Sequence, residues 1–533
     1  MSGNAHCRRV YWLLAFWAFS LTACQQHWTA YRAGRERMAN QPRPSALSNP
    51  VLVSSLHIGW QQHPMGAGMF RASPVLHKGK VYIGNGNGRF YALNAATGAI
   101  VWQYPPAAAP ALTSAFVCNP SSEGIASSAV ITRIHHTDAV VFGAPDRSIG
   151  AGLGSGRLFA LNAGTGAEIW KSPEIARITG TTFGSTTELH EQIGYSAPLI
   201  FEGRVYIGIA DHCDNPIQNG RISAVNLETG MIDPGFSFSA TSTRGGGVWN
   251  SVAALDAGLN DGIFVTTGNV RCWNGGCQGA PAINNGLALL RLSPKTGSIV
   301  WSFQPVPFNM DDDPDWAAGS TLMRTSCGRL VASVMKDGWS YAVNVGTAAP
   351  GTPAMRWQFP PVHVPFTSGD GTVHGDTDYN KPGAAWGDVF IITTGGLNVT
   401  SPVGLQNSFS RLHALNACAP EANRIRWIKD IPGVFGGGAL GPPTVSRGIV
   451  YVGTDAGHVV AIADPQVSPP AGLRCNQPDI PSALCTASGH QLVPDPAILA
   501  DVALNGSIHT EPVLVGGKVY VSTDAGFVYM LAK

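Results

Sequence analysis

The sequence predicts an all-β fold, an eight-bladed β-propeller, on the basis of three observations. A short pattern of apolar residues and Gly-containing turns recurs along most of the 533-residue chain. Gly and Pro are frequent, at 64 and 38 residues, while hydrophobic residues still make up 44% of the sequence. This composition favours many short strands joined by tight turns over disorder. The last copy of the pattern is incomplete, and a matching strand lies near the N-terminus.

The repeating unit combines strand residues with a characteristic turn. In the first copy, Val81-Tyr-Ile-Gly84 is followed by Ala92-Leu-Asn94, by Thr97-Gly98 and by Trp102. Alternating Val, Tyr and Ile suit half-buried strands, and Asn and Thr-Gly suit turns. Eight copies can be recognised, with their Ala-Leu-Asn-like elements at residues 92–94, 160–162, 224–226, 290–292, 342–344, 414–416, 461–463 and 529–531. Repetition of this kind, with four strands in each copy, is typical of propeller blades.

The two ends of the repeat region complement each other. The eighth copy ends at Lys533 without the Thr-Gly turn and the Trp strand that the other copies lead us to expect. The segment 54–61, which contains Trp60, precedes the first copy and has the character of that missing strand. We expect it to complete the last blade, because this pairing would close the ring and remove an exposed sheet edge.

The N-terminus has the features of an export signal. Arg8 and Arg9 precede a short apolar run that ends at Leu21. Residues 1–23 are predicted to be a signal peptide, because the run is too short to span a bilayer permanently. Leu21-Thr-Ala-Cys24 resembles a bacterial lipobox, with an ordinary secretory signal as the alternative. A lipidated Cys24 would anchor the protein at the periplasmic face of the cell envelope, at the outer membrane rather than the inner one.

The rest of the chain is predicted to divide into a linker and one domain. Residues 24–50 are polar and contain Pro, which is typical of a linker from a lipid anchor, and residues 51–533 would form the propeller. Charged residues make up only 13% of the chain, and the formal net charge is +1. No basic stripe is visible, which argues against nucleic acid as a partner.

The cysteine content suggests disulfides. Eight cysteines remain after Cys7 and Cys24 are set aside, an even number that fits an oxidising compartment. Proximity in the sequence favours the pairs Cys272–Cys277 and Cys475–Cys485. There is no Cys-x-x-Cys-His motif, so we expect no covalent c-type haem, and the spacings do not indicate a zinc site.

The repeat resembles that of a known family. The pattern Val-Tyr-x-Gly, then Ala-Leu-Asn-Ala-x-Thr-Gly-x-x-x-Trp, is similar to the repeats of propellers that bind pyrroloquinoline quinone (PQQ). The similarity covers nearly all of the mature chain. Such blades occur in quinoprotein alcohol dehydrogenases, including polyvinyl alcohol dehydrogenase, and in the non-catalytic scaffold lipoprotein of outer-membrane β-barrel assembly. The site residues must therefore decide between enzyme and scaffold.

The resemblance implies a cofactor site around Trp249. The sequence Gly246-Gly-Val-Trp249-Asn250 resembles the context of the family Trp that lies under the flat quinone, and an indole face suits stacking on a planar ring. Thr267-Gly268-Asn269 resembles the stretch with the calcium-ligating Asn, and Trp273 lies in the segment that follows it. An amide oxygen suits a hard cation. The alternatives are a Trp packed between blades and an ordinary turn Asn.

The resemblance also implies a catalytic base and a cation. The family base lies in an Asp-x-Trp-Asp element, and here Asp313-Pro-Asp315-Trp316 matches with its last two residues exchanged. Asp313 is the first choice, as base and metal ligand, and Asp315 the second. The carboxylates crowded between 311 and 315 would need water, protons or a cation, so an acidic surface turn is the alternative. Lys336 resembles the family cation that touches the quinone oxygens, unless it is a solvated turn residue.

Two departures from the family pattern are visible. A Glu that ligates calcium should precede the third Ala-Val-Asn element, but the chain has no Glu there. Asp211 or Asp214 would have to take its place, and Asp211 is chosen as the candidate metal ligand. The vicinal Cys-Cys pair of many alcohol dehydrogenases is absent. The histidines at 135, 136, 212 and 374 lack metal-ligand spacing and are expected to be loop or strand residues.

Taken together, the resemblance implies an exported quinoprotein dehydrogenase that uses PQQ and Ca²⁺ to oxidise an alcohol or a hydroxylated polymer. Lys336 would help to polarise the quinone, and Asp313 would accept the hydroxyl proton. Since no haem is expected, electrons would pass to a separate acceptor such as a cytochrome c or a quinone. The alternative is a propeller without a cofactor that acts as a binding or outer-membrane assembly scaffold.

Overall fold

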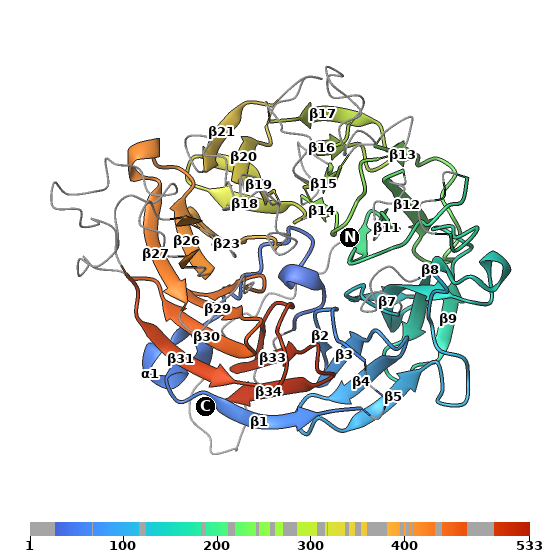
Figure 1. Ribbon diagram of the computed structural model, residues 1–533, viewed down its shortest axis with the longest axis horizontal. Coiled ribbons are helices and arrows are strands. Elements are labelled where there is room, and N and C mark those ends of the chain that lie inside the picture. Colours follow the sequence, from blue (N-terminus) through green and yellow to red (C-terminus); the bar gives the residue numbers. More distant parts are fainter. Residues whose placement is uncertain are drawn as a thin grey trace, which may run out of the picture.

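Eight antiparallel sheets of four strands each surround a common axis in the computed structural model (Figure 1). This arrangement confirms the predicted all-β, eight-bladed propeller. The structure describes residues 27–64, 66, 68–116, 124–182, 185, 187–211, 219–240, 245–255, 262–269, 285–305, 315–316, 318–335, 340–346, 353–359, 381–394, 399–400, 406–407, 410–431, 440–465 and 495–533.

The first four blades follow one another along the chain. Blade 1 contains β2 (Val75–His77), β3 (Lys80–Gly84), β4 (Phe90–Asn94) and β5 (Ile100–Tyr104). Blade 2 contains β6 (Val130–Ile134), β7 (Thr137–Asp146), β8 (Ser155–Asn162) and β9 (Glu168–Lys171). Blade 3 contains β10 (Leu199–Phe201), β11 (Arg204–Ile209), β12 (Arg221–Asn226) and β13 (Phe238–Ser239), and blade 4 contains β14 (Ala253–Ala254), β15 (Ile263–Thr266), β16 (Leu289–Leu292) and β17 (Ile299–Phe303).

The remaining blades have the same order of strands. Blade 5 contains β18 (Thr321–Thr325), β19 (Gly328–Val334), β20 (Ser340–Asn344) and β21 (Met355–Phe359). Blade 6 contains β22 (Ala384–Trp386), β23 (Val389–Thr394), β26 (Ser410–Asn416) and β27 (Ile425–Ile431), and β24 (Val399–Thr400) pairs with β25 (Gln406–Asn407) between its second and third strands. Blade 7 contains β28 (Thr444–Ser446), β29 (Ile449–Gly453), β30 (His458–Ala463) and β31 (Ile498–Ala503).

Blade 8 joins the two ends of the chain, as the sequence predicted. Its strands β32 (Val513–Val515), β33 (Lys518–Ser522) and β34 (Val528–Ala532) come from the C-terminus, and β1 (His57–Gln62) completes the sheet along β34. The register runs from His57 opposite Ala532 to Gln62 opposite Val528. Because β1 occupies the outer position, the last blade has four strands and the ring is closed.

Helices are few and short in the described residues. They are the 3₁₀ turns η1 (Tyr31–Ala33), η2 (Ala46–Ser48), η4 (Gly150–Gly152) and η5 (Glu421–Asn423), and the α-helix α1 (Pro50–Val53). In the part of the chain that is described, none is long and apolar enough to cross a membrane.

At three seams, the turn between the third and fourth strands of one blade also contacts a Trp of the preceding blade. In blade 2, Asn162 Oδ1 accepts the backbone N–H groups of Gly164 and Thr165, which shapes the turn between the third and fourth strands. Trp102 of blade 1 lies over Gly166 in this turn and donates its indole N–H to the Ala163 carbonyl at 3.3 Å. The same arrangement recurs for Trp60 over Gly98 and for Trp170 over Gly230. The repeated Trp therefore closes the seam between neighbouring blades.

Residues 28–41 of the N-terminal segment fill the middle of the ring (Figure 1). Trp28, Arg32 and Arg37 are no more than 1% exposed. This finding corrects the sequence-based prediction of a linker over residues 24–50, at least for the described residues from His27 onward. A linker would be solvated along its length, whereas these side chains are held inside the propeller.

Residues 28–41 hydrogen bond to the inner part of each blade in turn. Backbone groups of the segment bond to Leu76, Ile131, Ala254, Leu322, Ala385 and Val445, in blades 1, 2, 4, 5, 6 and 7. Side chains of the segment bond to blades 3 and 8. Arg37 donates to the Pro198 carbonyl before β10, and Gln41 donates to the Leu514 carbonyl of β32. The segment therefore connects all eight blades across the axis.

One ion pair lies at the centre of this hub. Arg32 and Glu511 are both fully buried, and Arg32 Nη1 lies 3.2 Å from Glu511 Oε2. Arg32 also donates to the carbonyls of Pro443 and Gly383. Burial raises the pKa of Glu511, an effect that the Arg32 charge opposes. Buried charges need such partners, because an uncompensated charge in the interior is strongly destabilising.

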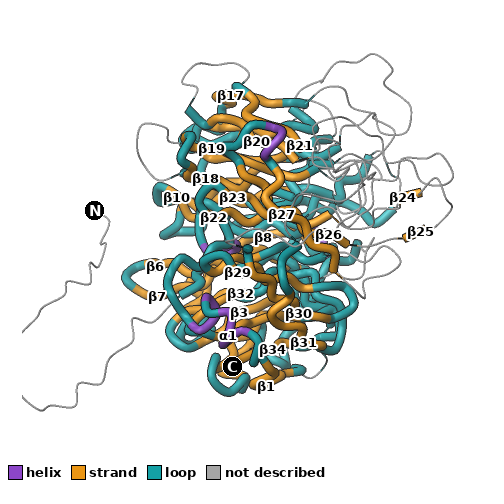
Figure 2. The backbone as a smooth tube through the Cα atoms, turned by 90° about the vertical axis from the view of Figure 1, so that its left-hand side faces the viewer, coloured by secondary structure: helices purple, strands orange, loops and turns teal. Residues whose placement is uncertain are grey.

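The two faces of the ring carry different connections. The turns between the first and second strands, at residues 77–80, 134–137, 201–204, 325–328, 386–389, 446–449 and 515–518, lie on one face, which we call the hairpin face. The connections between second and third strands and between blades lie on the other, which we call the site face. Figure 2 shows β6 and β7 reaching the left edge, on the hairpin face, and β24 and β25 on the opposite side.

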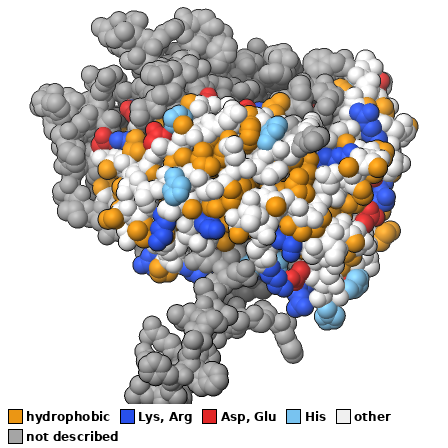
Figure 3. Space-filling model, turned by 90° about the horizontal axis from the view of Figure 1, so that it is seen from below, with side chains coloured by type: hydrophobic (Ala, Val, Ile, Leu, Met, Phe, Trp, Pro, Cys, Tyr) orange, Lys and Arg blue, Asp and Glu red, His pale blue; other side chains and the backbone are white. Residues whose placement is uncertain are grey.

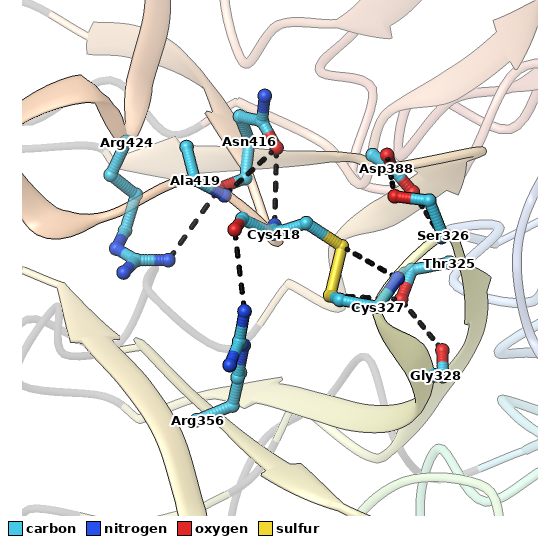
Figure 4. The surroundings of a disulfide bond; sticks show 10 residues. All are labelled: Thr325, Ser326, Cys327, Gly328, Arg356, Asp388, Asn416, Cys418, Ala419 and Arg424. Atoms are coloured by element: carbon cyan, nitrogen blue, oxygen red, sulfur yellow. Dashed lines mark hydrogen bonds between the residues drawn. A yellow bond between two sulfur atoms is a disulfide. The ribbon is translucent and has the colours of Figure 1, made fainter.

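A disulfide connects blades 5 and 6 on the hairpin face (Figure 4). Cys327, in the β18–β19 turn, is bonded to Cys418, which follows β26, with 5.6 Å between their Cα atoms. Ser326 donates hydrogen bonds to Asp388 beside it. The sequence analysis favoured near neighbours and did not identify this pair. The predicted pairs Cys272–Cys277 and Cys475–Cys485 lie outside the described residues.

Candidate functional site

Three segments from consecutive blades lie side by side on the site face. Residues 245–249, which lead into blade 4, run between the end of β11 in blade 3 and the end of β15 in blade 4. Val248 N–H donates to the Ile209 carbonyl at 3.1 Å, and Gly268 N–H donates to the Gly247 carbonyl at 2.8 Å. Gly246 N–H donates to the Asn269 carbonyl at 2.6 Å. These backbone bonds fix Asp211, Trp249 and Asn269 in neighbouring segments.

Trp249 lies against the backbone of Gly268. A Cβ atom at residue 268 would lie 2.6 Å from the indole Nε1 of Trp249 and 2.2 Å from Asp315 Oδ1. Only a residue without a side chain allows the indole and the carboxylate to approach the chain this closely. Trp249 is half-buried. Its position in the fold therefore differs from that of the Trp residues that close the seams between blades.

Asp315 reaches the same point from blade 5. Its Oδ1 accepts the backbone N–H of Asn269 at 2.5 Å, and both residues are 3% exposed. The neighbouring Trp316 is fully buried and packs against Phe303 and Tyr341. This aromatic packing holds the short segment that carries Asp315, which explains why the carboxylate is fixed beside Asn269.

Asp211 is a neighbour of this group through the backbone. It follows β11 and is 2% exposed. The preceding residue, Ala210, exchanges two backbone hydrogen bonds with Gln192. A Cβ atom added at Gly247 would lie 3.2 Å from the Cβ of Ala210. Asp211 is thus positioned between the segment that carries Trp249 and the segment before β10.

A small, partly open pocket lies at blade 2, and its lining includes Ser114, Gly143, Ala144, Gly156, Glu191 and Gln192. Asp211, Trp249, Asn269 and Asp315 are not among the residues that line it. Glu191 accepts a hydrogen bond from Arg221 at 2.6 Å, and Gln192 is the residue that bridges to Ala210. The pocket is therefore connected through Gln192 to the segment that carries Asp211.

Aromatic and acidic residues support the outer wall of the pocket. Phe116 stacks on the buried His190, with 4.0 Å between the ring centroids and 13° between the planes. His190 Nε2 lies 3.3 Å from Glu188 Oε2. The pKa of Glu188 is lowered, first by the hydrogen bond from the Thr182 backbone. This group is connected to the pocket through Gln192, whose side-chain amide donates to the Phe116 carbonyl at 3.4 Å.

The N-terminal segment lies beneath the site. The Tyr31 side chain hydrogen bonds to Asn250, the residue after Trp249, and burial raises the pKa of this tyrosine to about 12. Arg37 stacks over the Tyr31 ring and donates to the Val252 carbonyl at 3.1 Å. Tyr31 and Arg37 thus brace the Trp249 segment from the axis. Sequence reasoning missed both, because a Tyr and an Arg in a polar stretch carry no signal of burial.

The oxygen donors at the site suit a hard cation only in part. Asn269, Asp315 and Asp211 offer amide and carboxylate oxygens, the ligand type that Ca²⁺ prefers. Among the residues that the structure describes, no group of three or more His, Cys, Asp or Glu side chains could hold a metal ion. A calcium site here would therefore need the amide of Asn269 and donors beyond the described acidic residues.

Several predicted site residues cannot be placed. Trp273, Asp313 and Lys336 lie outside the described residues, as do Asp214, His212 and His374. Of the predicted constellation, Trp249, Asn269 and the second-choice acid Asp315 lie together, with Asp211 in the adjoining segment. The roles assigned to all of these residues remain predictions.

The chain matches one protein family over most of its length. Residues 48–370 match the family described as PQQ: glucose/ethanol/alcohol dehydrogenase, β-propeller domain. Quinohemoprotein alcohol dehydrogenase ADH IIB of Pseudomonas putida is 26% identical over 284 residues, which cover 48% of this chain and 36% of that protein. The matched part spans 36–44% of the lengths of the curated relatives.

Solved structures share the propeller fold. The quinohemoprotein alcohol dehydrogenase from Comamonas testosteroni has a TM-score of 0.63 at 17% identity, covering 95% of this chain and 81% of that one. BamB from Moraxella catarrhalis has a TM-score of 0.50 at 14% identity, covering 90% and 100%. At these identities the similarity concerns the fold alone. The match over residues 48–370 is more specific, and on that basis the chain belongs to the PQQ family of glucose, ethanol and alcohol dehydrogenase β-propeller domains.

Proposed function

We propose that the protein is an exported quinoprotein dehydrogenase that oxidises an alcohol or a hydroxylated polymer with PQQ and Ca²⁺. The observation that carries the proposal is the meeting of Trp249, Asn269 and Asp315, from two blades, on the site face. Membership of the family supports it. A propeller that served only as a scaffold would not need an indole, an amide and an acid at one point.

Each described residue has a specific part in this proposal. The Trp249 indole would support a planar ring, because aromatic faces bind flat ligands at low entropic cost. Asp315 orients Asn269 through its backbone N–H and adds negative charge beside the amide oxygen. PQQ would supply a two-electron acceptor when bound, and Ca²⁺ would supply positive charge to polarise it. Asp313 as proton acceptor and Lys336 as quinone contact complete the proposal from the sequence.

The cellular setting is part of the proposal. Residues 1–23 would direct export, and lipidated Cys24 would hold the protein at the periplasmic face of the outer membrane. A cytochrome c or a quinone would then receive the electrons. The disulfide between Cys327 and Cys418 supports an oxidising compartment.

The second candidate is a propeller that binds other proteins without a cofactor. The likeness of its fold to BamB and the lipobox favour this reading. It predicts that PQQ and Ca²⁺ leave the thermal stability of the protein unchanged. The enzyme reading predicts the opposite, because a ligand that binds the folded state raises its melting temperature.

The test is to incubate the purified protein with PQQ and Ca²⁺ and to measure cofactor binding together with alcohol-dependent reduction of a dye. We expect binding at micromolar concentrations and dye reduction with at least one alcohol or hydroxylated polymer. Trp249→Ala should weaken PQQ binding by about tenfold or more, since stacking contributes about 1–3 kcal/mol. Asp315→Asn should weaken the effect of Ca²⁺ on that binding.

Trp102→Ala is the matched control, because Trp102 closes a seam between blades 1 and 2 away from the site. It should lower the melting temperature and leave the PQQ affinity of the folded protein unchanged. If wild-type protein binds no PQQ at micromolar concentrations, the dehydrogenase proposal is wrong and the scaffold reading takes its place.

A further inference from the structure

Basic side chains gather on one sector of the hairpin face. The β28–β29 turn carries Arg447, β33 begins with Lys518, and the β2–β3 turn carries Lys78 and Lys80. Arg43, from the N-terminal segment, is exposed beside them. We call these five residues the basic collar. They belong to blades 7, 8 and 1, which are neighbours in the closed ring.

The collar has little negative charge to balance it. In the three turns at residues 446–449, 515–518 and 77–80 the sequence contains no Asp or Glu. The nearest carboxylate from blade 2 is Asp138, whose Oδ2 lies 2.5 Å from Lys78 Nζ and 3.1 Å from His77 Nε2. The pKa of Asp138 is lowered, first by its hydrogen bond with Lys78. Asp464 lies against the 446–449 turn, but its carboxylate pairs with Arg426 of blade 6. Since Asp138 is shared between Lys78 and Arg133, the collar carries more positive than negative charge.

This excess is local, since the whole chain has a formal net charge of only +1. Figure 3 views the rim on the side of β1 and shows several Lys and Arg side chains along the lower part of that rim, together with Asp or Glu and His side chains, and further Lys and Arg side chains toward the right. A concentrated patch on an almost neutral protein indicates a specific electrostatic partner, whereas a charge spread evenly would serve only solubility.

The described chain starts inside the collar. The His27 ring lies against the His77 ring, with 5.0 Å between the centroids, and Trp28 bonds to Leu76 of β2. The pKa of His27 is lowered by burial and then by the charges of His77, Arg43 and Lys78. Cys24 is three residues earlier in the sequence. An extended chain spans about 10 Å over that distance, so a lipid on Cys24 would bring headgroups close to the collar.

We propose that the basic collar docks on anionic phospholipid headgroups, so that the hairpin face rests on the membrane and the site face points away from it. The distance from Cys24 is about one Debye length at about 0.1 M salt, so that the collar would feel the surface charge of the bilayer. In this orientation, substrates and an electron acceptor have free access to the site face. The anchor alone would hold the protein in any orientation.

Vesicle binding by the full chain with Cys24→Ser, which cannot be acylated, tests the collar without the anchor. We expect the protein to float with vesicles that contain phosphatidylglycerol and to stay in solution with pure phosphatidylcholine. About 0.5 M salt should release it. The triple variant Arg43→Glu/Arg447→Glu/Lys518→Glu should bind the anionic vesicles about tenfold less tightly or weaker still, because each basic residue near such a surface contributes to binding.

A triple variant on the other face is the matched control. Arg147→Glu/Lys171→Glu/Arg177→Glu changes the net charge by the same amount, but these residues belong to the β7–β8 connection, to the end of β9 and to the β9–β10 connection. It should bind anionic vesicles like the parent chain. If the collar triple does not fold, the milder Arg447→Gln/Lys518→Gln replaces it, with a smaller loss expected.

Three results would each overturn the proposal. The parent chain could bind neutral and anionic vesicles equally, or not at all, in which case the collar serves a partner other than lipid, such as an acidic protein face. The collar variant could keep its vesicle binding, or the control variant could lose as much as the collar variant. The assay contains no PQQ and no alcohol, so its outcome is independent of the proposed dehydrogenase activity.

Discussion

At the scale of single residues, His509 shows how burial in the ring affects an ionisable group. It precedes β32 on the site face, and its Nε2 lies 3.8 Å from Asp524 Oδ2. Burial lowers the pKa of His509, the Asp524 hydrogen bond opposes this, and the charges of Lys381 and Arg71 add to the lowering. The pKa of Asp524 is lowered, first by the same hydrogen bond. The folded protein therefore favours a neutral histidine here.

Because the pKa of His509 is lower in the folded protein than in the unfolded chain, the stability of the folded protein depends on pH. The unfolded chain takes up a proton near the ordinary histidine pKa of about 6.5, whereas folded His509 stays neutral to lower pH. Its contribution to stability is present above about pH 6.5 and is lost as the pH falls below that value. We expect His509→Gln to reduce the drop in melting temperature between about pH 7 and pH 5.

The exposed His57 of β1 provides the control for this measurement. His57→Gln should leave the drop in melting temperature as it is in the wild-type protein. An unchanged pH profile for His509→Gln would contradict the assignment, whatever the absolute stability of that variant.

At the scale of the element, the seam between blades depends on a glycine with two constraints. Gly166 has a φ of +76°, a conformation that other residues rarely adopt, and a Cβ there would lie 2.7 Å from Cδ2 of Trp102. Gly203, in the β10–β11 turn, has nearly the same φ of +75° but has open space where a Cβ would be. A substitution at Gly203 therefore tests the cost of backbone strain alone. A substitution at Gly166 adds the cost of displacing Trp102.

We expect Gly203→Ala to lower the free energy of unfolding by about 1 kcal/mol, the typical cost of a left-handed backbone for a residue with a Cβ. Gly166→Ala should cost at least about 1–2 kcal/mol more, because the indole of Trp102 must move out of the seam. Urea unfolding of both variants measures the difference. Equal losses would mean that the Trp102 contact with blade 2 adds nothing to stability.

The same element explains why the sequence predicted the fold so well. The Asn, Thr-Gly and Trp positions act within one repeat or between adjacent repeats, so that their spacing along the chain is visible without a structure. Trp60 near the N-terminus fits the gap left by the eighth copy for the same reason, and β1 pairs with β34. The prediction succeeded where local chemistry repeats.

It failed where partners are distant in the sequence. Arg32 looks like one more charged residue in a polar stretch, since Glu511 lies 479 positions away. Cys327 and Cys418 are separated by 91 residues, and proximity could not suggest them. The preference for Asp313 over Asp315 stays a prediction, because Asp313 lies outside the described residues, whereas Asp315 lies at the Asn269 backbone. The anchoring role of the buried Trp316 beside it had no sequence signal.

At the scale of the whole molecule, the disulfide strengthens one junction of the ring. It closes a loop across 91 residues between blades 5 and 6. Loop-closure entropy of this size corresponds to about 4–5 kcal/mol at most, with measured values usually nearer 2–4. We expect Cys327→Ser/Cys418→Ser to lower the melting temperature. A reducing agent should then no longer cause the part of the fall in melting temperature that comes from breaking this disulfide.

Calorimetry with and without reductant measures this effect. Asp388→Asn is a suitable control, because Asp388 accepts hydrogen bonds from Ser326 at the same junction without taking part in the disulfide. It should have a smaller effect and should keep the response to reductant. A double cysteine variant as stable as the parent would show that the other contacts of blades 5 and 6 suffice to hold the junction.

The hub formed by residues 28–41 has a consequence for how the chain reaches its native state. These residues precede the strands of all eight blades in the sequence, yet Arg32 and Gln41 bond to Glu511 and Leu514 at the eighth blade. Contacts between such remote positions form slowly, so the centre of the ring is completed only after the eighth blade has been synthesised. A product that terminated before this blade would leave the Arg32 guanidinium without the Glu511 carboxylate.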